Sequence, residues 1–124
     1  MLAFEELDAF KVCHQLTLGI HRVVEKIGDR DPELAGQLWI AALFASGRIA
    51  RGAGFLNRRM FAMCLDRTLG ALHEIGYHLD LARGLTLLDE ETHRELEGLR
   101  GRATFYTTKL LTSLQDDPGP GDRP

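Results

Sequence analysis

The sequence lacks the features that would place the chain in a membrane or in an oxidising compartment. Its longest unbroken apolar run, Leu38 to Ala45, is eight residues, whereas a membrane-spanning helix needs about 20. The first twenty residues include three acids and no basic segment followed by an apolar one, so no targeting peptide is predicted. We therefore expect a cytoplasmic protein with no membrane partner.

Cysteine and positive charge are also scarce. Cys13 and Cys64 are the two cysteines, too far apart for the C-x-x-C spacing of a redox pair or a zinc knuckle. They are interpreted as buried small apolar side chains. The formal net charge of −3 excludes a protein whose whole surface binds nucleic acid through positive charge. A length of 124 residues predicts a single domain that can bury one core.

Apolar residues recur at helical spacing in four segments, and no strand-like alternation persists. The predicted helices run from Leu7 to Ile27, from an Asp31 cap to about Gly54, from an Asn57 cap to Gly84, and from Asp89 to Leu114. Short connections favour antiparallel neighbours, which predicts an all-α, up-down-up-down four-helix bundle over residues 1–115. Residues 116–124, rich in proline and glycine, are predicted to form a disordered tail.

The second predicted helix is apolar on every face between Leu38 and Ala45, whereas a helix at the edge of a monomer should have a polar side. Its anchor-type side chains predict a subunit interface in a homo-oligomer. The interface residues are Trp39, Ile40, Leu43 and Phe44, and the small residues Ala41, Ala42, Ala45, Ser46 and Gly47 would let another helix approach. The alternative is a deeply buried helix in an uneven monomer.

The sequence shows no motif for catalysis, for a cofactor or for a metal. His14 and His21 are about 10 Å apart along one helix, too far to bind one ion. Glu74 and His78 could touch one metal, but no second pair with this spacing completes a site. We therefore predict a protein that is not an enzyme and has no cofactor.

One stretch is strongly basic. From Gly36 to Arg67 the chain carries five arginines and one acid, a local charge of +4. Four of these arginines flank the turn between the second and third helices, where they could bind a phosphate backbone or an acidic partner. The nucleic-acid candidates are Arg48, Arg51, Arg58 and Arg59. The alternative is an ordinary solvated helix end, since Arg48 and Arg51 also suit the dipole of their helix.

Two segments resemble a known family. The opening Phe4-Glu5-Glu6-Leu7, followed by Phe10, His14 and Leu16, resembles the Phe-x-Asp-Leu-x-x-Trp-x-x-Ala-x-x-Leu start of bacterial four-helix-bundle proteins encoded in intervening sequences of large-subunit ribosomal RNA genes. Gln37-Leu38, Ala41-Ala42-Leu43, Ile49-Ala50 and Gly52 match the family's second-helix pattern. The resemblance covers Phe4 to Leu114.

The resemblance implies a homo-oligomeric ring of five bundles without enzymatic activity. A relative of the family is an accessory, nucleic-acid-binding partner of a reverse transcriptase in diversity-generating retroelements. The resemblance thus also implies an alternative function, RNA or DNA binding in association with the ribosome, a retroelement or a nucleic-acid-associated protein. Where the family has paired arginines this chain has Trp39 and Ile40, which favours a subunit contact over RNA binding at that face.

Overall fold

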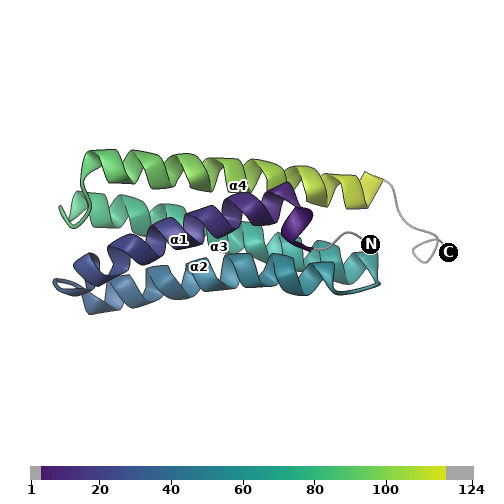
Figure 1. Ribbon diagram of the computed structural model, residues 1–124, viewed down its shortest axis with the longest axis horizontal. Helices are drawn as coiled ribbons and strands as arrows, with labels where there is room; N and C mark the ends of the chain where they lie inside the picture. Colours follow the sequence, from purple (N-terminus) through teal and green to yellow (C-terminus); the bar gives the residue numbers. More distant parts are fainter. Residues whose placement is uncertain (1–3, 117–124) are drawn as a thin grey trace.

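The computed structural model describes residues 4–116 and consists of four long helices preceded by a short 3₁₀ helix. The elements are η1 (Phe4–Glu6), α1 (Asp8–Gly28), α2 (Pro32–Ala53), α3 (Arg58–Gly84) and α4 (Glu90–Asp116). Successive helices run in opposite directions, so α1 begins and α4 ends at the same end of the bundle as the α2–α3 connection (Figure 1). No strand occurs among residues 4–116. The predicted all-α class with four helices is confirmed.

The helices begin where the capping residues predict. The carboxylate of Asp31 accepts a 3.0 Å hydrogen bond from the backbone N–H of Leu34 at the start of α2. The side-chain oxygen of Asn57 accepts a 3.2 Å bond from the backbone N–H of Met60 at the start of α3. Asp89 does the same for α4, at 2.7 Å. Each cap satisfies at least one of the N–H groups that a helix leaves without an intrahelical partner, and Asn57 also accepts from the backbone N–H of Arg59 at 2.8 Å.

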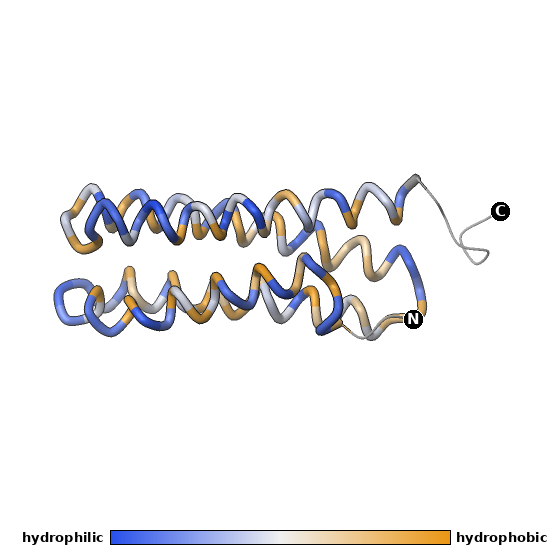
Figure 2. Tube along the Cα trace, turned by 45° about the horizontal axis from the view of Figure 1, so that its top comes forward, coloured by the Kyte–Doolittle hydropathy of each residue, from blue (hydrophilic) through white to orange (hydrophobic). Residues whose placement is uncertain are grey.

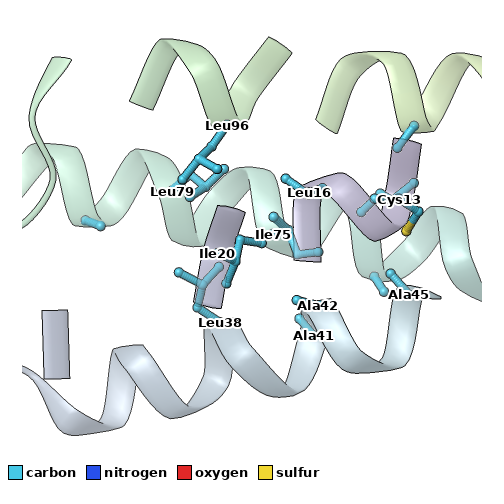
Figure 3. Close-up of a cluster of buried hydrophobic side chains, with 14 of the residues drawn as sticks. Cys13, Leu16, Ile20, Leu38, Ala41, Ala42, Ala45, Ile75, Leu79 and Leu96 are labelled. Carbon is cyan, nitrogen blue, oxygen red and sulfur yellow. The ribbon is translucent and has the colours of Figure 1, made fainter. Parts of the chain in front are cut away.

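Each helix packs against two neighbours, and the pairs α1–α2, α2–α3, α3–α4 and α1–α4 close the bundle. Figure 2 shows hydrophobic and hydrophilic residues interspersed along every helix, as expected for helices with one buried stripe. Figure 3 shows side chains from all four helices meeting in one apolar core. Its fully buried large members include Leu16, Ile20, Leu38, Leu65, Leu72, Ile75 and Leu79. Burying each such side chain contributes about 1.5–3 kcal/mol.

Two glycines bring helices close together. A Cβ added at Gly52 of α2 would lie 2.8 Å from the Cβ of Cys64 in α3, and one added at Gly19 of α1 would lie 2.7 Å from a methyl of Leu96 in α4. Both distances are well below normal carbon contacts. Because Gly52 must face α3, the rotation of α2 about its own axis is fixed.

Buried hydroxyls fix α2 against both neighbours. The Thr17 hydroxyl lies 2.6 Å from the Ser46 hydroxyl and 3.0 Å from the Cys13 carbonyl oxygen, to which it donates. Thr68 of α3 donates to the Ala45 carbonyl oxygen at 3.0 Å. Burial raises the pKa of the Cys13 thiol to about 11, more than the hydrogen bond from Ser46 lowers it. Cys13 is therefore a neutral packing residue at physiological pH.

The structure describes α4 as far as its last residue, Asp116. Residues 117–124 of the predicted tail lie outside the described residues, so their disorder stays a prediction.

Candidate subunit interface

Helix α2 lies at the edge of the bundle opposite α4 (Figure 1), and its outer face carries large apolar side chains. Ile40, Leu43 and Phe44 expose 59%, 49% and 40% of their surface. Ile40 and Leu43 are three residues apart, and Ile40 and Phe44 are four apart, so the three side chains are neighbours on the helix surface. Single exposed leucines are normal on protein surfaces, but three adjacent large apolar residues form a patch.

Trp39 is less exposed than the three patch residues. Trp39 is half-buried, and its ring centroid lies 5.2 Å from that of His21 in α1. Of the four predicted interface residues, three are therefore exposed together, and Trp39 is partly covered by α1. The sequence shows these four large apolar residues within six positions but not which of them α1 covers.

The small residues of α2 also divide between two roles. The alanines that the sequence offers as a surface for a second helix are buried, because they pack in the core of their own bundle: Ala41, Ala42 and Ala45. Ser46 is half-buried and bonds to Thr17. Gly47 is exposed, as is Gly36, and a Cβ added at either position would meet no atom within 4 Å. Space for a second helix is therefore found at these two glycines.

The four candidate arginines do not form one cluster of equivalent cations. The guanidinium carbon of Arg48 lies 4.7 Å from the Phe44 ring centroid, and that of Arg51 lies 5.7 Å from the Phe55 ring centroid. Both distances fit cation–π contacts. Arg51 and Arg59 are exposed, whereas Arg48 is half-buried.

Arg58 serves the fold. It is half-buried, and its Nη2 donates a 3.3 Å hydrogen bond to the carbonyl oxygen of Leu114 in the last turn of α4. A cation suits that position because the C-terminal end of a helix carries partial negative charge. This contact links the α2–α3 turn to α4 and gives the arginine at the start of α3 a structural role.

An apolar cavity at this end of the bundle was not predicted from the sequence. It measures about 330 Å³ and lies between the α2–α3 turn and the last turns of α4. Leu56 stands at its rim and exposes 91% of its surface. In the sequence, the sign of this feature is a large apolar residue, Leu56, at a turn. The residues on either side of Leu56 do not indicate a cavity.

A charged cluster at the opposite end also escaped prediction. Nε2 of the buried His93 lies 2.8 Å from the Asp80 carboxylate, and Arg83 contacts both Nδ1 of His93 and the Glu90 carboxylate at 3.3 Å. The cluster joins α3 to α4. His78 lies 3.9 Å from Glu74. Within residues 4–116, no three His, Cys, Asp or Glu side chains are arranged so that they could hold a metal ion.

Comparisons with known proteins add no relative. A scan against protein-family models found no match, and a search of curated proteins found none either. The family resemblance therefore rests on the residues of this chain alone. Over the described part of the chain, no helix has the length and hydropathy to span a membrane.

Proposed function

We propose that this chain is a non-enzymatic assembly module that forms homo-oligomers through the outer face of α2. One observation carries the proposal: Ile40, Leu43 and Phe44 are exposed side by side on one helix. The core is closed by the opposite face of α2, and of the three only Phe44 has a described ring contact, with the Arg48 guanidinium on its own helix. In this proposal the chain catalyses no reaction, and it binds a second copy of itself.

The area left on these three residues is large enough to matter. Fully burying a large apolar side chain is worth about 1.5–3 kcal/mol. Ile40, with 59% of its surface exposed, retains roughly 1–2 kcal/mol of that gain, and Leu43 and Phe44 retain somewhat less each. Together they would supply a few kcal/mol per copy if a second chain covered them fully.

The resemblance supports assembly and implies five copies in a ring. The exposed residues of α2 support a subunit contact, and the number of copies has to be measured. The proposal about α2 therefore stands apart from the ring size.

The experiment is a comparison of molar mass by light scattering. Ile40→Glu and Phe44→Glu each place a charge in the patch and should convert the assembly to monomer while the helical circular dichroism stays unchanged. Tyr77→Glu is the matched control, because Tyr77 of α3 is 64% exposed and lies on another helix. A monomeric wild-type chain, or an assembly that resists either α2 variant, would refute the proposal.

The second candidate function is nucleic-acid binding, and the exposure of Arg51 and Arg59 on either side of the α2–α3 turn favours it. An assembly would bring several copies of this pair together and raise the avidity for a phosphate backbone. Titration with structured RNA should then show affinity that falls steeply with salt and that Arg51→Glu with Arg59→Glu abolishes. Binding that survives both changes would exclude these arginines from the role.

A further inference from the structure

The outer face of α2 has a spacing that reads the same in both directions. Gly36, Ile40, Leu43 and Gly47 follow at intervals of four, three and four residues, and they lie within about 60° of one another around the helix axis. All four are exposed. We propose that α2 pairs with α2 of a second copy about a two-fold axis, with the two helices antiparallel. This inference rests on the proposed function and specifies its partner surface.

The midpoint of the pattern lies between Ile40 and Leu43. In an antiparallel pair centred there, Ile40 faces Leu43 of the second copy, and Gly36 faces its Gly47. The same contacts then occur twice, which is the defining property of a two-fold interface. The apolar pair occupies the centre, and the glycines lie on either side of it.

Neither glycine is required by packing inside its own bundle, since an added Cβ would find open space there, as it would at Gly70, Gly84, Gly98 and Gly101. Glycine in a helix interior destabilises the helix relative to alanine. At Gly52 a close neighbour explains the choice, but at Gly36 and Gly47 an added Cβ would meet nothing within 4 Å. Close approach of another backbone is one reason for glycine, and the two-fold pair provides it at both positions.

Charges at the two ends of the face favour the antiparallel direction. Glu33 and Arg51 are exposed at the start and the end of α2, about 13 Å and 14 Å from the midpoint along the axis. Among residues 4–116 neither forms an ion pair; Arg51 contacts the Phe55 ring instead. An antiparallel pair sets Glu33 opposite Arg51 of the second copy at both ends, whereas a parallel pair sets like charges together. The antiparallel direction also opposes the two helix dipoles favourably.

The direction can be measured by disulfide crosslinking in the full chain. Glu33→Cys and Arg51→Cys should each give no crosslinked dimer alone, because identical positions lie at opposite ends of the pair. A mixture of the two variants should crosslink under mild oxidation. The native Cys13 and Cys64 are buried, and Gly70→Cys on the outer face of α3 serves as the control that crosslinks with neither. Self-crosslinking of Glu33→Cys would overturn the antiparallel pair.

Charge reversal gives a second readout that does not depend on oxidation. Glu33→Arg alone sets two pairs of like charges together and should weaken association on the order of tenfold, as should Arg51→Glu alone. A mixture of the two variants restores opposite charges at both ends and should associate as tightly as wild type. Failure of the mixture to recover would contradict the pairing of Glu33 with Arg51.

The number of copies separates this inference from the proposal on which it rests. A two-fold α2 contact gives a particle with an even number of chains, in contrast to the ring of five that the resemblance implies. An odd-numbered particle that Ile40→Glu dissociates would overturn the two-fold pairing and leave the proposed function standing. A particle that Ile40→Glu does not affect, or a monomer, would overturn both.

Discussion

Two glycines of the bundle should respond in opposite directions to the same substitution. Gly52→Ala adds a methyl 2.8 Å from the Cβ of Cys64 and 2.8 Å from the ring of Phe61. The Cys64 Cβ is fixed to the backbone of α3, so it cannot move without shifting the helix. Gly70→Ala adds the same methyl to open space on the outside of α3.

The magnitudes follow from two effects. Both substitutions gain about 0.5–1 kcal/mol from better helix propensity. Only Gly52→Ala also overpacks the core, which costs about 1–3 kcal/mol. Gly70→Ala should therefore raise the free energy of unfolding by about 0.5–1 kcal/mol relative to wild type. The free energy of unfolding of Gly52→Ala should be about 1–3 kcal/mol lower than that of Gly70→Ala.

Urea unfolding followed by circular dichroism, at one protein concentration for all variants, measures the difference. Equal stabilisation by the two substitutions would refute the reasoning. It would mean that Gly52 does not face α3, that α2 is rotated about its axis, and that Ile40 and Leu43 are not the residues of its outer face.

The remaining predictions concern single polar groups. A hydrogen bond from the backbone N–H of Thr92 holds the pKa of Asp89 below its ordinary value of 3.8. The charged cap therefore contributes its full stability at pH values above 3.8, and this contribution is lost as the pH falls through the lower pKa of the folded state. Asp89→Ala should thus be less stable than wild type at neutral pH in thermal melts, and the gap should close in strong acid; a gap that does not depend on pH would contradict the cap. Thr68→Val removes the bond to the Ala45 carbonyl oxygen and should cost about 1–2 kcal/mol in urea unfolding. Thr107 is buried, and its hydroxyl has no hydrogen-bond partner within residues 4–116. Thr107→Val should therefore leave the free energy of unfolding unchanged or raise it. A loss of stability as large as that of Thr68→Val would show that the hydroxyl has a partner.

The fold could be predicted from the sequence because its signals are local. Asp31, Asn57 and Asp89 each begin a helix with a side chain that caps it, and the apolar spacing between caps identifies the buried stripe. The α1 bounds of Asp8–Gly28 differ by one residue at each end from those predicted, within the usual variation of helix termini.

The candidate site could be predicted only in part, because exposure depends on which helices are neighbours. Trp39 and Ile40 are adjacent apolar residues, yet one packs beside His21 and the other faces outward. Likewise Arg58 and Arg59 are adjacent cations, and only the position of α4 makes Arg58 a partner of Leu114. The sequence contains no signal for either distinction, since the 3.6-residue period gives the faces of a helix but not what covers them.

The measurement that tests the central claim most directly is the molar mass of the wild-type chain and of Ile40→Glu by light scattering over a range of concentrations. The account predicts a wild-type particle that is a multiple of the 13.9 kDa chain and a monomeric variant with the same helix content. A wild-type monomer at all concentrations, or an Ile40→Glu particle as large as the wild type, would contradict it.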